Sequence, residues 1–130
     1  MLKPQVVIFH EDDIDKIIQE CLTHPYCKIM VAVKASKIKD TALNFLNQIN
    51  PVILARKARI HTCYTRIDFT NGAELLIIGN NTQSRGQRAS KIYCSPDTSI
   101  EVYFEVLWPR ILDYEYVLRN IKAGNIKNEI

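Results

Sequence analysis

Two short apolar segments, separated by a segment with helical spacing of apolar residues, constrain the fold of this chain more than any other feature. Residues 5–10 (QVVIFH) and 28–33 (KIMVAV) have the length and composition of buried strands. The segment between them carries one apolar helical stripe, which consists of Ile14, Ile17, Ile18, Cys21 and Leu22. A strand, a helix and a second strand in this order favour a parallel sheet covered by helices.

The ends of the expected helices are also marked in the sequence. The acidic residues 11–13 (EDD) suit the start of the first helix, where carboxylates complement the helix dipole, and residues 24–25 (His-Pro) end it. Ser36 is the expected N-cap of a second helix, which residues 50–51 (Asn-Pro) end. The apolar stripe of this second helix is Ile38, Ala42, Phe45, Leu46 and Ile49.

The centre of the chain predicts a β-hairpin. Residues 60–69 (IHTCYTRIDF) and 74–78 (ELLII) are rich in β-branched, aromatic and aliphatic residues, and Asn71-Gly72 lies between them. Asn-Gly between two such runs is the strongest local signal for a hairpin, which we place at residues 60–78. This hairpin would extend one edge of the sheet.

The C-terminal part predicts one more strand and two helices. Residues 91–95 (KIYCS) are the third core strand, and residues 96–112 are a helix capped by Asp97 or Thr98. Residues 113–123 are a last helix. These elements together predict an α/β domain of three layers, with a mainly parallel sheet and a β-hairpin insert.

The composition is that of one globular domain, residues 1–130. Hydrophobic residues make up 47% of the chain and charged residues 24%, which excludes disorder as its main state. The longest apolar runs, such as residues 75–79, have five residues, far fewer than the roughly 18 residues of a membrane span. The N-terminus lacks the pattern of a signal peptide, so we expect no membrane partner and an intracellular location with reduced cysteines.

Positive charge is concentrated in the middle third of the chain. Residues 51–95 carry seven Lys and Arg against two acids, whereas the whole chain has a net charge of only +3. Such a block either contacts phosphates or an acidic protein, or forms a solvated face. The candidate contact residues are Arg56, Lys57, Arg59, Arg85, Arg88 and Lys91.

The polar segment 80–90 (NNTQSRGQRAS) is long for a connection in a small α/β domain, which indicates a functional or a flexible loop. Arg85 and Arg88 flank a glycine there and could grip phosphate or carboxylate groups with two hydrogen bonds each. If this loop binds the partner, replacing both arginines with alanine should abolish binding and leave stability nearly unchanged.

The turn after the first strand does not have the composition of a phosphate-binding loop. Such a loop needs glycines for backbone approach and a lysine for charge, whereas this turn reads His10-Glu11-Asp12-Asp13. Three carboxylates there would repel a triphosphate. We therefore expect no ATP or GTP hydrolysis, no micromolar nucleotide affinity and no cofactor.

Residues 66–112 nevertheless resemble the middle of the ATPase domain of phage terminase large subunits. That family has a hairpin of the form I-x-F-x-N-G-[S/A], a polar loop with R-G-x-R, and then a hydrophobic strand ending in paired acids. Residues 67–73 match the hairpin, residues 85–88 match the loop, and residues 91–94 lie where the strand should be. The resemblance implies an NTPase-like domain of viral or mobile-element origin.

This chain departs from the terminase pattern in its catalytic elements. The strand that should end in Asp-Glu, to hold magnesium and polarise water, continues as Cys94-Ser95-Pro96-Asp97. Acids also replace the phosphate-binding loop. The resemblance therefore implies an NTPase-like scaffold that lacks the machinery of hydrolysis.

Two metal sites can be considered. Cys21, His24 and Cys27 have a zinc-like spacing, with Cys63, Cys94 or His61 as a fourth ligand. However, Cys21 lies on the apolar helix stripe and Cys27 opens a core strand, so we interpret both as buried structural thiols. His10 with the acids at 11–13 and Asp97 could instead hold Mg²⁺ or Mn²⁺ in a nuclease, but we interpret those acids as the start of a helix and His10 as a surface residue.

These observations favour a small viral protein without catalysis that binds a macromolecular partner inside the host cell, such as a host or defence complex. A protein partner is the first expectation and nucleic acid the second. The alternatives are a DNA-packaging accessory that binds DNA through the basic block, and a metal-dependent nuclease. Any aromatic residue left exposed in the last helices would serve as a protein-binding anchor, and the candidates are Tyr103, Phe104, Trp108, Tyr114 and Tyr116.

Overall fold

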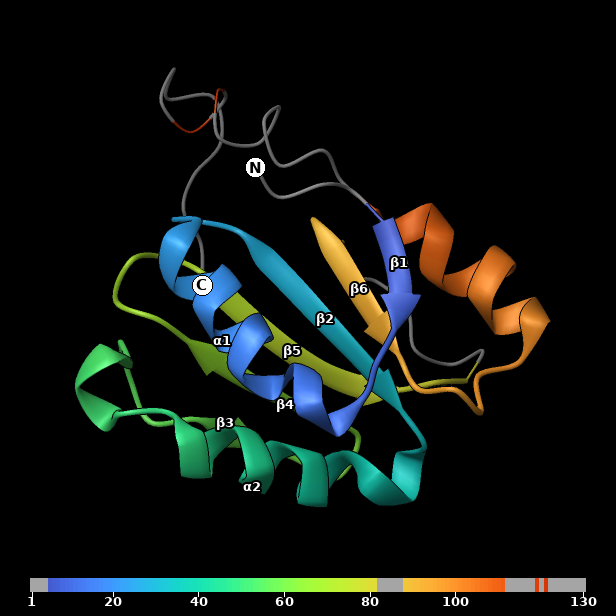
Figure 1. Cartoon of the computed structure of the whole chain (residues 1–130), viewed down its shortest axis with the longest axis horizontal. Helices are drawn as coiled ribbons and strands as arrows, with labels where there is room; N and C mark the ends of the chain where they lie inside the picture. The colour runs from blue at the N-terminus through green and yellow to red at the C-terminus, as the bar shows by residue number, and fades with distance from the viewer. Residues whose placement is uncertain (1–4, 82–87, 112–118, 120, 122–130) are drawn as a thin grey trace.

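The computed structural model describes residues 5–81, 88–111, 119 and 121. Within these residues, six strands form one mixed sheet in the order β1-β6-β2-β5-β4-β3 (Figure 1). The pairs β1–β6, β6–β2 and β2–β5 are parallel, and β5–β4 and β4–β3 are antiparallel. The bounds are Gln5–Ile8 (β1), Lys28–Val33 (β2), Arg59–Ile60 (β3), Tyr64–Asp68 (β4), Glu74–Gly79 (β5) and Lys91–Cys94 (β6).

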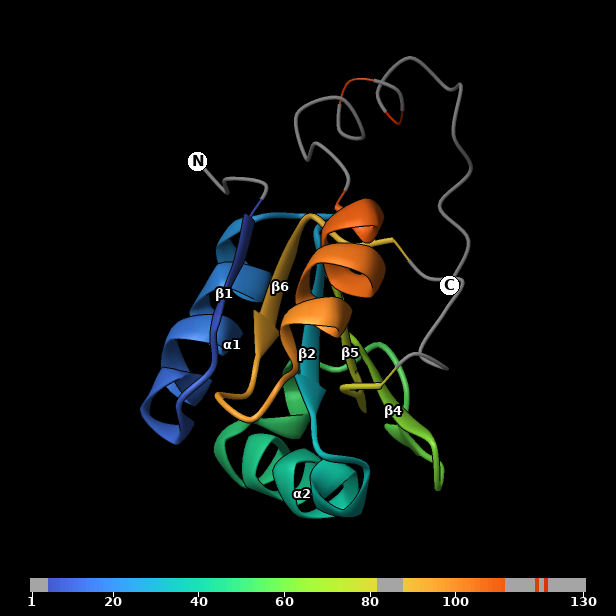
Figure 2. The same ribbon diagram turned by 90° about the vertical axis from the view of Figure 1, so that its right-hand side faces the viewer.

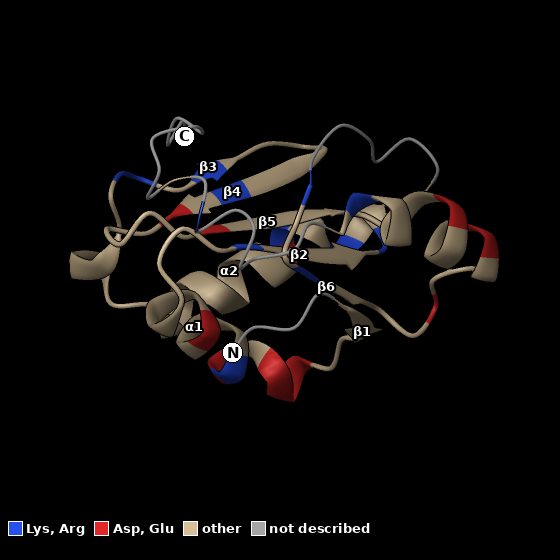
Figure 3. Ribbon diagram, turned by 90° about the horizontal axis from the view of Figure 1, so that it is seen from above, with Lys and Arg blue, Asp and Glu red and all other residues tan. Residues whose placement is uncertain are grey.

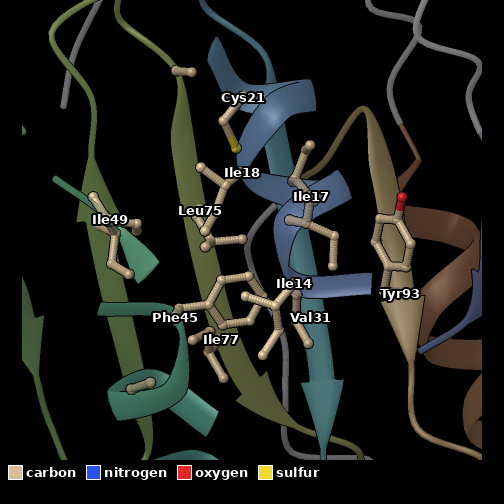
Figure 4. Packing of buried hydrophobic residues seen from close by; sticks show 14 of the residues in the cluster. Ile14, Ile17, Ile18, Cys21, Val31, Phe45, Ile49, Leu75, Ile77 and Tyr93 are labelled. Atoms are coloured by element: carbon tan, nitrogen blue, oxygen red, sulfur yellow. The ribbon is translucent and has the colours of Figure 1, made fainter. Parts of the chain in front are cut away.

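Two helices, α1 (Ile14–Thr23) and α2 (Ile38–Gln48), cover one face of the sheet (Figure 2). The predicted apolar stripes face the strands: Ile17 and Cys21 of α1 and Phe45 of α2 are fully buried in one cluster with Leu75 and Ile77 of β5 (Figure 4). These stripes fold the helices onto the sheet because burial removes their apolar surface from water.

A third helical segment covers the opposite face. Residues 100–101 are α-helical, Val102–Leu107 form a π-helix and Trp108–Arg110 a 3₁₀ turn, and we call the whole segment helix 100–110. A second apolar cluster joins this helix to the strands, with Val102, Val106 and Leu107 packed against Met30 and Ile92. The predicted α/β architecture, with a mainly parallel sheet and helices on both faces, is confirmed in the described residues.

The hairpin is confirmed, and its turn is tied to α1. β4 and β5 pair in an antiparallel register that sets Asp68 opposite Glu74. Asn71 Nδ2 donates to the carbonyl oxygen of Cys21 at 2.8 Å. Gly72 has φ +88°, and a Cβ at that position would collide with the ring of Tyr26. Glycine is therefore required at this turn for its conformation and for space.

Two predicted helix caps are wrong. Ser36 makes no capping hydrogen bond, because a 3₁₀ turn (Ala35–Lys37) starts the helix one turn earlier. Helix 100–110 is capped by Ser99, whose Oγ accepts from the Val102 amide at 3.2 Å, and not by Asp97 or Thr98. The predicted helix at 113–123 lies almost wholly outside the described residues.

Strand β6 lies between β1 and β2, although it is the last of the six described strands in sequence order. After β1 and after β2, the chain continues on the face that α1 and α2 cover. After β6, it continues on the opposite face, which helix 100–110 covers. Neighbouring strands whose chains leave to opposite faces open a crevice at their carboxyl ends, which is where α/β sheets bind ligands.

Candidate functional site

Lys91, one of the predicted contact residues, lies inside the protein. Its side chain is 5% exposed, and Nζ lies 2.7 Å from Oε2 of Glu20 on α1. The hydroxyl of Tyr93 donates to the other oxygen of the same carboxylate, and the ammonium lies 4.8 Å from the centre of the Tyr93 ring. This arrangement joins β6 to α1 and leaves the ammonium no access to a partner.

Tyr93 predicts a loss of stability in alkaline solution. Burial, and then the hydrogen bond to Glu20, raise the pKa of its phenol far above the ordinary value. An unfolded tyrosine ionises near pH 10, so the folded state binds this proton more tightly and loses stability as the pH rises above about 10. Tyr93→Phe should flatten this dependence in urea unfolding at increasing pH. Tyr64→Phe, at an exposed tyrosine, is the control and should leave this pH dependence unchanged. If Tyr93→Phe also leaves it unchanged, Tyr93 is not its source.

Arg56 and Arg59 are held by a buried carboxylate. Asp68 on β4 is 1% exposed, and its Oδ2 lies 2.9 Å from Arg59 Nη2 and 3.7 Å from Arg56 Nε. Its Oδ1 lies 3.2 Å from Nε of Arg66, whose Nη2 contacts Glu74 at 2.8 Å. Burial raises the pKa of Glu74 despite the attraction of the basic neighbours.

Of the five predicted contact residues that the structure describes, Lys91 alone is buried, and Arg56 and Arg59 keep about half of their side chains exposed. Lys57 and Arg88 are exposed, Arg85 lies outside the described residues, and Arg56 and Arg59 share Asp68. Figure 3 shows basic positions on β3 and β4, away from the acidic positions next to α1. The network at Asp68 has a structural explanation, since a buried carboxylate needs ionic partners.

The acidic turn after β1 closes on itself. The amide of His10 donates to Asp13 Oδ2 at 2.8 Å, and the Asp13 amide donates to the His10 carbonyl oxygen at 2.8 Å. Glu11, Asp12 and Asp13 form a 3₁₀ turn that leads into α1, as expected for acids at a helix start. Among the described residues, no group of three His, Cys, Asp or Glu side chains is placed to hold a metal ion.

The cysteines of the zinc-like spacing are buried thiols. Cys21 and Cys27 are fully buried, and Nδ1 of His24 lies 2.9 Å from the Glu20 carbonyl oxygen. A hydrogen bond with Cys27, and then burial, raise the pKa of Cys21, and burial raises that of Cys94. Raised thiol pKa values describe unreactive structural cysteines.

A pocket of about 600 Å³ lies at the carboxyl ends of β1, β6 and β2. Residues 9–11 follow β1, Lys34 and Lys37 follow β2, and residues 95–97 follow β6, and all of them line this pocket. The first turns of α2 form another wall. We call it the strand-end pocket, and its position is the crevice that the strand order creates.

Asp97 belongs to a hydrogen-bond network beside the strand-end pocket. Nδ2 of Asn80, directly after β5, donates to Asp97 Oδ1 at 3.2 Å, to Ser95 Oγ at 3.0 Å and to Thr98 Oγ1 at 3.1 Å. The Ser95 hydroxyl also donates to Asp97. This network fixes the segment after β6, which explains why Asp97 does not cap the next helix.

The outer side of helix 100–110 exposes large apolar side chains. Ile100 is 77% exposed, Phe104 60% and Trp108 39%. They follow one another at intervals of four residues, so they lie along one side of the helix. We call these three residues and Tyr103 the aromatic face.

The aromatic face is held in place by ring contacts. The Tyr103 ring packs edge-on against Phe104 at 4.9 Å and Trp108 at 6.2 Å between centroids. Its hydroxyl donates to the Val6 carbonyl oxygen of β1 at 3.3 Å. The Trp108 amide donates to the Tyr103 carbonyl oxygen, five residues back, and such π-helical turns often occur at functional sites.

The comparisons with protein-family models, with curated proteins and with solved structures find no match to this chain. Within the described ranges, no helix has both the length and the apolar character that a membrane crossing requires.

Sequence reasoning identified part of the candidate sites. Phe104 and Trp108 were named as anchors, but Ile100 was not. Lys34 and Thr41 in the strand-end pocket were missed. Lys34 directly follows β2, which is a usable signal, whereas Thr41 lies on α2 and has no such signal.

Proposed function

We propose that this protein binds a protein partner through the aromatic face and catalyses no reaction. The observation that carries the proposal is the exposure of Phe104 and Trp108 on one ordered helix. Large aromatic side chains are the commonest anchors of protein interfaces, because they bury much apolar area at little cost in conformational entropy. A single exposed apolar side chain needs no explanation, but Ile100, Phe104 and Trp108 place three large ones on one side of the helix.

The charges beside the stripe describe the complementary partner. Glu101 and Glu105 are exposed on the same helix. A partner that matches this helix offers an apolar groove with basic residues along its rim, as in other helix-in-groove complexes.

The alternatives have less support in the described residues. Arg56 and Arg59, which a DNA-binding accessory would use, are paired with Asp68. The acids at 11–13, which a nuclease would use, form a closed helix start. The resemblance of residues 66–112 to terminases extends the proposal to an NTPase-like scaffold of viral origin whose partner belongs to a host or defence complex, and that extension rests on the resemblance alone.

The test is capture of the partner from host lysate, followed by measurement of the dissociation constant. Phe104→Ala and Trp108→Ala should each weaken binding about 30-fold, which corresponds to the loss of about 2 kcal/mol typical of an interface anchor. Val52→Ala, at a residue 80% exposed on another part of the surface, should bind like the wild type. All three should keep the wild-type melting temperature, since no described core residue is changed.

The double variant Arg85→Ala/Arg88→Ala separates the aromatic face from the polar loop. If this variant loses binding and both aromatic variants keep it, the proposed surface is wrong and the loop is the binding site. Binding that falls steeply with salt and is competed by DNA would instead favour the DNA-packaging accessory.

A further inference from the structure

The strand-end pocket has the size and position of a small-molecule site, and the proposed function does not use it. Its volume of about 600 Å³ lies within the range of roughly 300–1,000 Å³ that is usual for ligand pockets. It is lined by residues that follow three parallel strands, on both sides of the position where the chain changes face.

A largely buried threonine of α2 lines this pocket. Thr41 on α2 is 9% exposed, and its side chain has no hydrogen-bond partner among the described residues. A hydroxyl group at a pocket wall can donate one hydrogen bond and accept others, so it can contact a polar group of a bound ligand.

The walls of the pocket carry unpaired charges of both signs. Lys34, Lys37, Glu11 and Asp40 all line it, and all four are exposed. None of these four forms an ion pair within the described part of the chain, whereas six other ion pairs are present there. A ligand of one sign would be attracted by one pair and repelled by the other.

The pocket also has an apolar surface. Phe9 lines it directly after β1, Val33 at the end of β2, and Pro96 after β6. The Phe9 ring is held by stacking against Phe45 at 6.3 Å between centroids. Such a surface suits the side chain of a ligand whose polar groups meet the charged walls.

We propose that the strand-end pocket binds a small zwitterionic ligand, an amino acid or dipeptide with an apolar side chain. The carboxylate of the ligand contacts Lys34 and Lys37, and its ammonium group contacts Glu11 and Asp40. The side chain packs on Phe9 and Pro96. This site is independent of the aromatic face, which lies on the opposite side of the sheet from α2.

Calorimetric titration with three related probes tests the charge requirement. The probes are L-phenylalanine, 3-phenylpropionate, which lacks the ammonium group, and phenethylamine, which lacks the carboxylate. L-phenylalanine or the dipeptide Phe-Phe should bind with a dissociation constant about tenfold or more below that of either single-charge probe, since each probe loses a charge-assisted contact. Equal binding of a single-charge probe, or no binding of either zwitterion at millimolar concentration, overturns the proposal.

Matched variants locate the site. Lys34→Met/Lys37→Met and Glu11→Gln should each weaken zwitterion binding about tenfold, and Thr41→Val should weaken it less. Lys39→Met and Asp12→Asn, at exposed neighbours outside the pocket, are the controls and should bind like the wild type. If the control variants weaken zwitterion binding as much as the pocket variants do, the ligand binds elsewhere. Because these changes leave the aromatic face intact, loss of zwitterion binding with partner capture preserved separates this proposal from the proposed function.

Discussion

Replacing Lys91 with methionine should lower the free energy of unfolding by about 3–5 kcal/mol, the usual cost of removing one partner of a buried ion pair. The side chain of Lys91 is 5% exposed and its ammonium lies 2.7 Å from Glu20, so the variant leaves a carboxylate without its cation. Tyr93 would still donate to Glu20 but carries no charge. Urea unfolding followed by circular dichroism measures the loss.

A second substitution, at Glu20, tests whether the unpaired carboxylate causes the loss of stability. Glu20→Gln in the Lys91→Met background should recover part of the lost stability, because no charge is then left without a partner. Lys57→Met, at an exposed residue of the same basic block, should change stability by less than about 0.5 kcal/mol. A Lys91→Met variant that is as stable as the wild type but no longer binds the partner would return Lys91 to the contact role that the sequence suggested.

Asp68→Asn should destabilise the protein by a similar amount, about 3–5 kcal/mol, because three guanidinium groups then lose their shared carboxylate. Arg59 and Arg66 face each other directly across β3 and β4, so their repulsion is no longer compensated. The loss should be smaller at high salt, which screens repulsion between half-exposed charges.

Chemical unfolding of Asp68→Asn at low and high ionic strength checks this expectation. Asp15→Asn, at an exposed carboxylate of α1, is the control and should unfold like the wild type at both salt concentrations. If Arg59→Gln does not restore stability to Asp68→Asn, repulsion between the arginines is not the cause.

Elements defined by local patterns could be predicted from the sequence. The strand at 28–33 coincides with β2, and the Asn71-Gly72 turn forms the expected hairpin. These predictions hold because strand length, helical stripe and turn chemistry depend on neighbours within a few positions. The cap at Asp97 failed because of a more distant contact: Asn80, at another strand end, binds Asp97, and Ser99 caps the helix instead.

The candidate sites depended on tertiary structure to different degrees. The sequence named Phe104 and Trp108 as anchors if exposed, and only the packing of Val102 and Val106 against the sheet decided which side of the helix remained outside. The residues of the strand-end pocket could not be predicted from the sequence, because the sequence does not show that β6 lies between β1 and β2 in the sheet.

By itself, then, the sequence determined the alternation of strands and helices, the hairpin and the absence of a glycine-lysine phosphate loop, since each is a property of consecutive residues. Only the tertiary structure decided the roles of the charged residues. Lys91 and Glu20 are 71 positions apart, and Asp68 forms ion pairs with Arg56, Arg59 and Arg66. Whether a lysine or arginine binds a partner or stabilises the interior depends on burial and on which carboxylate folding brings within reach, and neither quantity is a property of neighbouring residues.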